Sequence, residues 1–179
     1  ITTPFAPGAW ALYTDANPLW TLGEVDPGVG MEALAEDGDA AALGAVPERG
    51  GVFNTPAGST DPGPILLGDS YTFTFEAEPG DLLSFATMFV QSNDLFIGVE
   101  DLALFDGDTP VEGDLTAQLG LYDAGTEVNQ RPGTGPDQAP RQAGPDTGAD
   151  ETLAVGPVDD GFTYPAASDV LSFSVTVVP

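Results

Sequence analysis

The chain has 179 residues, 41% of them apolar, with 29 Asp and Glu against three Arg, no Lys and no His, for a formal net charge of −26. This length and apolar content predict one domain, residues 1–179, and favour a globular over a disordered chain. The charge would repel a nucleic acid, so DNA and RNA partners are excluded. The absence of Cys and His excludes disulfides, thiolate or imidazole metal sites, and catalysis through Ser-His or Cys-His pairs.

The first part of the chain predicts short strands and one helical insertion. Residues 9–14 alternate loosely and predict a strand, and residues 19–22 predict a short extended piece. The helical insertion covers about residues 27–46. Asp26 followed by Pro27 is typical of an N-cap and first helical position, and Asp39 is placed to cap a second, shorter helix. The first helix has apolar residues at helical spacing, namely Met31, Leu34 and Ala35.

The most hydrophobic run, residues 82–90, predicts a central strand buried on both faces. Before it, residues 70–77 alternate aromatic and polar side chains, which predicts a half-buried strand joined to the central one as a hairpin through Pro79-Gly80. The other predicted strands are a short piece at 52–53, then 97–104, 115–122 and 170–178.

A long loop rich in Pro and Gly occupies about residues 128–160. Its composition alone is typical of a disordered linker. Two of the three Arg lie in it, and we expect Arg131 and Arg141 to pair with carboxylates and hold the loop against the body. The predicted strands are separated by turn residues, there is one helical insertion, and strands and helices do not alternate regularly as in βαβ units. This pattern predicts an all-β, antiparallel β-sandwich.

Eight segments cover nearly the whole chain in this order: APGAWALYT, MEALAEDGD, GVFNTP, SYTFTFEAEPGD, SFATMFVQSNDLFIGVEDLALFD, LYDAGTE, PGTGPDQAPRQAGPDTGADE and GFTYPA. This series resembles the spondin N-terminal domain, found in F-spondin and in single-domain secreted proteins of bacteria and archaea. The resemblance implies a β-sandwich and an ordered long loop. One departure is that the family usually begins with an extra strand, whereas here only Ile1-Thr2-Thr3-Pro4 and Phe5 precede the first segment. That strand is missing, unusually short or supplied from elsewhere.

The resemblance also implies a calcium site. In the family, Ca²⁺ is bound by acidic residues in the loop after the central strand and in the Asp-Ala-Gly-Thr segment. Position by position, this implies Asp94, Asp123 and Glu127 as ligands, with backbone carbonyls completing the shell; Glu127 stands where family members often have Asp. The alternative for each residue is a solvated surface carboxylate.

Composition alone favours that alternative, because acids are spread along the chain and Lys is absent, as in proteins adapted to concentrated salt. At this composition, about five acid-x-acid triplets arise by chance. Asp37-Gly-Asp39 and Asp106-Gly-Asp108 are therefore interpreted as turns or helix caps, and neither completes an EF-hand loop.

These observations predict a non-enzymatic, calcium-binding module that acts in adhesion to a surface or matrix component. Two alternatives remain open. One is a self-assembling subunit of an extracellular filament, in which a neighbouring copy supplies a missing edge strand. The other is a glycan hydrolase that uses paired carboxylates.

The expected location is extracellular or at the cell surface. No apolar run in the sequence is long enough to cross a bilayer. Because the chain opens on Ile1 and not on Met, we interpret it as a mature product whose signal sequence has been removed.

Overall fold

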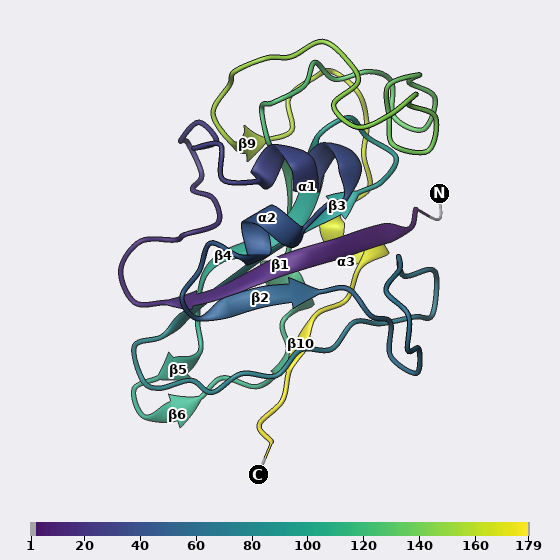
Figure 1. Cartoon of the computed structure of the whole chain (residues 1–179). Helices are drawn as coiled ribbons and strands as arrows, with labels where there is room; N and C mark the ends of the chain where they lie inside the picture. Colours follow the sequence, from purple (N-terminus) through teal and green to yellow (C-terminus); the bar gives the residue numbers. More distant parts are fainter. Residues whose placement is uncertain (1–2, 179) are drawn as a thin grey trace.

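The computed structural model describes residues 3–178 and has an all-β fold built on one large antiparallel sheet (Figure 1). Its strands lie in the order β2-β1-β3-β4-β8-β9, and neighbouring strands run antiparallel throughout. The all-β prediction is thereby confirmed. The bounds are β1 Phe5–Tyr13, β2 Gly50–Phe53, β3 Leu82–Phe89, β4 Leu95–Ala103, β8 Gly120–Asp123 and β9 Gly156–Pro157.

Strand β3 is central, as its apolar sequence predicts. All of its residues except Leu82 are buried. It pairs with β1 through Trp10 opposite Phe85, and with β4 through Phe85 opposite Val99. Because β3 has neighbours on both edges and buried side chains on both faces, a layer of other segments must cover each face of the sheet.

Two short helices, α1 (Met31–Asp37) and α2 (Ala41–Gly44), cover one face of the sheet (Figure 1). The predicted apolar spacing is confirmed: Met31, Leu34 and Leu43 are fully buried in a cluster that also contains Trp20 and Phe96. Among the residues that the structure describes, no helix is long and apolar enough to span a bilayer.

The predicted N-cap of the first helix is wrong. Asp26 instead accepts a hydrogen bond from the N–H of Gly28 at 3.1 Å and so closes a local turn. Helix α1 begins at Met31, after Gly30, whose φ of 121° is readily adopted only by glycine. Asp39 accepts from the N–H of Ala41 at 3.0 Å, but the N-cap of α2 is Ala40, which makes no side-chain cap, so the predicted cap at Asp39 lies one residue too early.

The second face of the sheet is covered by extended segments. Residues 70–77 keep the predicted alternation, with Tyr71 and Phe73 half-buried and the intervening Thr72 exposed. Phe73 stacks on Trp10 with ring centroids 5.2 Å apart and on Phe53 at 5.3 Å. The segment is nevertheless not a strand of a sheet, and the predicted hairpin is wrong, because β1 and β4 already occupy both edges of β3.

The remaining predicted strands are confirmed only in part. A 3₁₀ helix, η1 (Thr116–Gln118), stands where we expected the first half of the strand 115–122. The last segment forms helix α3 (Ala167–Val170) and only a two-residue strand, β10 (Ser174–Val175), paired with β7 (Gly113–Asp114).

The Asp-Gly-Asp segment at 106–108 is a turn, as predicted. It joins β5 (Phe105–Asp106) to β6 (Thr109–Pro110) in a small hairpin, and Gly107 has a φ of 61°. Asp37-Gly-Asp39 likewise ends α1, with Gly38 as its left-handed C-cap.

The loop between β8 and β9 has hydrogen bonds of its own, including Val128 N–H to the Ala149 carbonyl at 2.9 Å. The predicted ion pairs of Arg131 and Arg141 are wrong. Arg141 instead donates to the Gly135 carbonyl at 2.7 Å and to the side chain of Gln138, both within the loop. The ion pair present within residues 3–178 is Arg49–Asp81, at 2.6 Å. Amide and carbonyl groups therefore hold the loop together.

Candidate metal centre

The candidate site lies where β4 begins and β8 ends. Asp94 directly precedes β4, after a turn that Ser92 closes by donating to the Phe89 carbonyl at 2.6 Å and accepting from the Leu95 N–H at 3.1 Å. Asp123 is the last residue of β8 and lies opposite Leu95 in the sheet. Antiparallel pairing therefore places the two aspartates at one edge of the sheet, as expected for acidic residues at strand ends.

Only one of the two carboxylate oxygens of Asp94 has hydrogen-bond partners. Its side chain is fully buried, and Oδ2 accepts the backbone N–H groups of Thr126 and Glu127 at 2.8 and 3.1 Å. Oδ1 is buried and has no hydrogen-bond partner among the described residues. A buried carboxylate oxygen without a donor is energetically costly, so this atom calls either for a bound cation or for a proton shared with the neighbouring carboxyl group of Asp123.

Two other carboxylates face Asp94. One oxygen each from Asp94, Asp123 and Glu151 lie within 4.8 Å of one another. Asp123 is held in place by the Gly125 N–H at 2.7 Å and by the Asn129 side-chain amide at 2.6 Å. The backbone N–H of Glu151 donates to the Thr126 carbonyl at 2.8 Å, and this bond fixes the far end of the long loop beside the two aspartates.

The electrostatics of the three carboxylates are unfavourable without a cation. Burial, followed by repulsion from Asp123, raises the pKa of Asp94 to about 7. Burial also raises the pKa of Asp123, and burial together with the charge of Asp123 raises the pKa of Glu151. A bound divalent cation would reverse this effect, because it favours the ionised form of each carboxylate.

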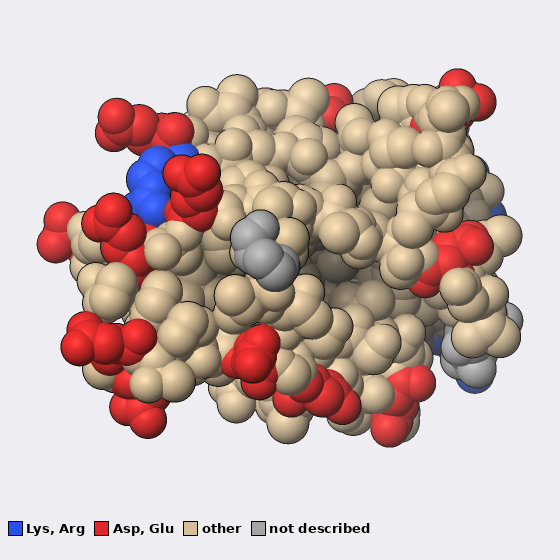
Figure 2. Space-filling model, turned by 90° about the horizontal axis from the view of Figure 1, so that it is seen from below, with Lys and Arg blue, Asp and Glu red and all other residues tan. Residues whose placement is uncertain are grey.

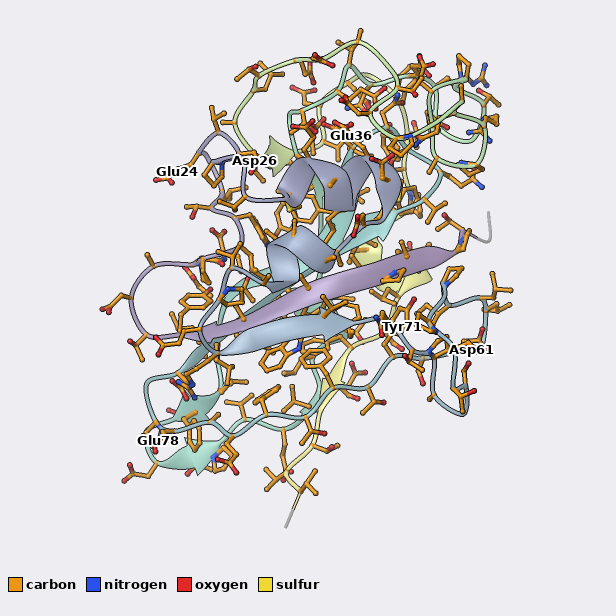
Figure 3. The ribbon with its side chains drawn as sticks, in the orientation of Figure 1. Glu24, Asp26, Glu36, Asp61, Tyr71 and Glu78 are labelled. Atoms are coloured by element: carbon orange, nitrogen blue, oxygen red, sulfur yellow. The ribbon has the colours of Figure 1, made fainter. Side chains whose placement is uncertain are left out.

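Glu127, the third ligand that the family resemblance implies, lies beside this group but is not one of the three converging carboxylates. It is buried, and its Oε1 accepts from the side-chain amide of Asn93 at 3.1 Å. Glu36 of α1 is also buried, on the side of the helix that faces the long loop (Figure 3). Burial is the main cause that raises the pKa of Glu127 to about 7 and that of Glu36 to about 8.

Sequence reasoning missed Glu151. It lies in the Gly- and Pro-rich loop next to another acid, Asp150, with no periodicity that would select one of the two. A second group of carboxylates that meet within 4.8 Å, Glu32, Glu36 and Asp146, was also not foreseen. Glu32 and Asp146 are solvent-exposed, and exposed acidic groups commonly lie together without a bound ion.

Buried amides join the long loop to the turn before β4. The Asn93 side-chain oxygen accepts the backbone N–H of Gln130 at 2.9 Å and the side-chain amide of Gln138 at 3.2 Å. Gln138 is fully buried and also donates to the Arg131 carbonyl at 3.1 Å. The loop is therefore anchored directly next to the candidate site, although its composition resembles a linker.

The arrangement can hold a hard cation, because every converging ligand atom is a carboxylate oxygen. Comparison with known proteins adds no identification, since neither a protein-family model nor a curated protein matches the chain. The spondin resemblance therefore rests on the sequence segments alone.

The raised pKa values predict that the metal-free protein loses stability as pH rises from about 4, the pKa of an unfolded carboxyl group, to about 8, and that the part of this loss between about pH 5.5 and about pH 8 comes from the groups with raised pKa values. Asp94, Glu127 and Glu36 have folded-state pKa values above their unfolded values, so the stability they contribute at low pH is lost as pH rises through about 7 to 8. With no His in the chain, few other groups titrate in this range. Thermal melts in EDTA across the range measure the loss; a flat melting temperature would contradict it.

Proposed function

We propose that this protein is a calcium-binding, spondin-like module that acts outside the cell or at its surface by binding a partner, without catalysis. The observation that carries the proposal is the unpaired, fully buried Oδ1 of Asp94, which belongs to a residue whose carboxylate converges with those of Asp123 and Glu151. Folding three like charges together is costly. A divalent cation between them would stabilise the native state.

Calcium suits this group better than other common metals. The converging atoms are oxygens, and the chain has neither His nor Cys to supply the nitrogen or sulfur that Zn²⁺ or Cu²⁺ prefers. Ca²⁺ accepts about six to eight oxygens in flexible geometry and can complete its shell with backbone carbonyls and water. Mg²⁺ demands near-octahedral geometry and loses its water reluctantly, which disfavours it at a buried site assembled from loops.

The position of the site suggests what calcium would do. The three carboxylates come from the turn before β4, the end of β8 and the far end of the long loop. A cation shared by them would fix the loop against the sheet edge. An ordered loop with exposed polar and Pro-rich sequence is a suitable surface for a matrix component or a glycan.

A glycan hydrolase is less well supported. Its two carboxyl groups must both reach the substrate, one on each side of the scissile bond. Asp94 is 0% exposed, and its Oδ2 is occupied by two backbone N–H groups. Burial of this kind suits a structural cation ligand better than an acid or a nucleophile.

Calorimetric titration and thermal melts in about 2 M NaCl test the proposal, because concentrated salt suppresses nonspecific attraction of cations to the acidic surface. We expect calcium at about 100 times its dissociation constant to stabilise the wild type by about 2.7 kcal/mol. We expect Glu151→Gln to weaken binding at least about tenfold, a loss of about 1.4 kcal/mol. Glu127→Gln should have a smaller effect, because Glu127 lies outside the converging group.

Glu112→Gln is the matched control, since it removes one charge from an exposed acid that belongs to neither carboxylate group. It should leave calcium affinity unchanged. If the wild type gains no stability from calcium, the site does not bind it. If Glu127→Gln abolishes binding and Glu151→Gln does not, the ligand set implied by the family resemblance is the correct one.

A further inference from the structure

An apolar groove of about 450 Å³ lies on the face of the sheet opposite the helices. Its floor is formed by Phe5, Phe53 and Phe85 of the sheet, and its two walls are the segments 65–73 and 169–173. Figure 2 shows the lower face of the molecule with a hollow near its middle, surrounded mostly by uncharged atoms. None of the converging carboxylates of the metal centre is among the residues that line the groove.

The groove has the width that one extended strand needs. Phe73 of the first wall stacks on Phe53 of β2 with ring centroids 5.3 Å apart. Phe173 of the second wall contacts Phe85 of β3, with centroids 5.1 Å apart. Strand β1 lies between β2 and β3, so these two strands are two strand spacings apart, about 9.5 Å. Walls that rest on them leave room for one strand between them.

The first wall has a free main-chain edge. The Ser70 carbonyl accepts from the Ala57 N–H at 2.8 Å, and the Glu76 carbonyl accepts from the Arg49 side chain at 3.0 Å. These two carbonyls are an even number of residues apart in an extended segment, so they lie on the same edge. The main-chain groups of Tyr71 and Phe73 then point to the other edge, and they make no hydrogen bond within residues 3–178.

The second wall also has a free edge. The N–H of Phe173 donates to Thr116 Oγ1 at 3.0 Å, and its carbonyl accepts from the Leu115 N–H at 2.9 Å, so these groups face the β7 side. Main-chain groups alternate in direction along an extended segment, so those of Ser172 point away from β7. Ser172 lines the groove, and its main chain makes no hydrogen bond within the described part of the chain.

We propose that this groove binds an extended segment of a different polypeptide, one with apolar side chains at alternate positions and Lys or Arg between them. The two free edges offer main-chain hydrogen bonds to a strand laid between them. Side chains alternate along a strand, so every second one faces the aromatic floor and the others face the rim. The bound strand also covers Leu66 and Leu67, which are 62% and 89% exposed at the groove.

Charge selects a basic strand. Asp69 and Asp169 are exposed and line the groove, and no Arg is among its lining residues in the described chain. Asp69 is held at the rim by the hydrogen bond that its Oδ2 accepts from the Leu66 N–H at 3.0 Å. These two carboxylates and the net charge of −26 attract a basic segment and repel an acidic one.

A second copy of the chain cannot supply such a strand. The chain has no Lys and only three Arg. Arg49 pairs with Asp81, while Arg131 and Arg141 lie in the Gly- and Pro-rich loop, which has no apolar alternation. The partner is therefore a different protein, in which basic residues alternate with apolar ones. The inference holds whether or not the metal centre binds calcium.

Calorimetric titration with synthetic peptides about eight residues long tests the proposal in about 1 M NaCl, which screens nonspecific attraction to the acidic surface. The probe peptide alternates Val and Lys. Three matched peptides each change one property: one alternates Val and Glu, one has the residues of the probe in two blocks, and one carries N-methyl groups along one main-chain edge. We expect each of the three to bind at least about tenfold more weakly than the probe.

A main-chain variant locates the bound strand. Ser172→Pro removes an N–H that makes no hydrogen bond in the described structure, and Leu171 already has the extended conformation that a residue before proline favours, with φ −136° and ψ 141°. The variant should melt like the wild type and bind the probe at least about fivefold more weakly. Ser172→Ala is the matched control, since it keeps the N–H and should bind like the wild type.

A charge variant tests the groove independently of the main chain. Asp169→Asn should reduce the preference for the Val-Lys peptide over the Val-Glu peptide by at least about threefold. Asp15→Asn removes the same charge at an exposed position outside the groove and should leave that preference unchanged.

Several outcomes overturn the proposal. The Val-Lys peptide fails to bind, the block or N-methylated peptide binds as tightly as the probe, or Asp169→Asn and Ser172→Pro both bind it like their controls. Sedimentation velocity of the wild type tests the other occupant. Association of the protein with itself that the Val-Lys peptide reverses would identify a second copy as the occupant and contradict the assignment to a different polypeptide.

Discussion

Asp94→Asn and Asp94→Ala should change the stability of the calcium-free protein in opposite directions at about pH 8, where Asp94 is largely ionised. Alanine leaves the backbone N–H groups of Thr126 and Glu127 without an acceptor in a buried site. Each such loss costs about 1–3 kcal/mol, so we expect a destabilisation of about 3 kcal/mol and a melting temperature lower by about 10 °C.

Asparagine keeps those two hydrogen bonds, because its side-chain oxygen can accept them in place of Oδ2. Its NH₂ group would then occupy the position of Oδ1 and could donate toward Asp123 and Glu151. The variant also removes a buried charge that Asp123 repels. We therefore expect Asp94→Asn to be more stable than the wild type by about 1 kcal/mol without calcium.

Thermal melts in EDTA and in calcium measure both variants, and neither should respond to calcium. Asp101→Asn is a control, because it changes the same chemical group at an exposed position outside the carboxylate groups. It should keep the calcium response of the wild type. If Asp94→Asn is as unstable as Asp94→Ala, then the charge of Asp94 stabilises the fold, and the interpretation of Oδ1 as an unsatisfied atom is wrong.

The family resemblance selected Asp94 and Asp123 from the sequence, and strand pairing explains why the two residues meet. Asp94 and Asp123 stand at ends of predicted strands, and antiparallel pairing of β4 with β8 brings these ends together. Glu151 was not predictable, because its position depends on the path of a long loop that has no hydrophobic periodicity. Loop positions of this kind are fixed by hydrogen bonds such as that from Glu151 N–H to the Thr126 carbonyl, which composition does not reveal.

The fold was likewise predictable where it depends on a local sequence pattern, and not where it depends on partners distant in the sequence. The apolar run 82–90 correctly predicted a central strand, since a strand buried on both faces needs no polar side chains. The alternation in residues 70–77 correctly predicted which side chains are half-buried and which are exposed. It did not predict hydrogen-bond partners, because side-chain period determines the buried face of an extended segment but not what lies along its edges.

Removing salt should destabilise the protein strongly. Its 29 carboxylates face only three Arg, and the ion pair found within residues 3–178 is Arg49–Asp81. Acidic side chains are spread around the face seen in Figure 2. The distance over which they repel one another is about 3 Å at 1 M salt and about 10 Å at 0.1 M. We expect the melting temperature in EDTA to fall by about 20 °C or more between about 3 M and about 0.1 M NaCl, a loss of several kcal/mol.

Concentrated NaCl both screens charge and lowers the activity of water. We expect the loss of stability at low salt to come from unscreened repulsion between carboxylates, and a triple variant tests this. Asp106→Asn/Asp108→Asn/Glu112→Gln removes three exposed charges near the β5–β6 hairpin, where these side chains make no hydrogen bond in the described structure. It should need less salt than the wild type for the same melting temperature. Asp106→Glu/Asp108→Glu/Glu112→Asp keeps the charge at these positions and should behave like the wild type. Sucrose strengthens burial without screening charge, so it should replace little of the effect of NaCl. If sucrose restores stability as fully as salt does, repulsion between the carboxylates is not what destabilises the protein, and the acidic surface needs another explanation.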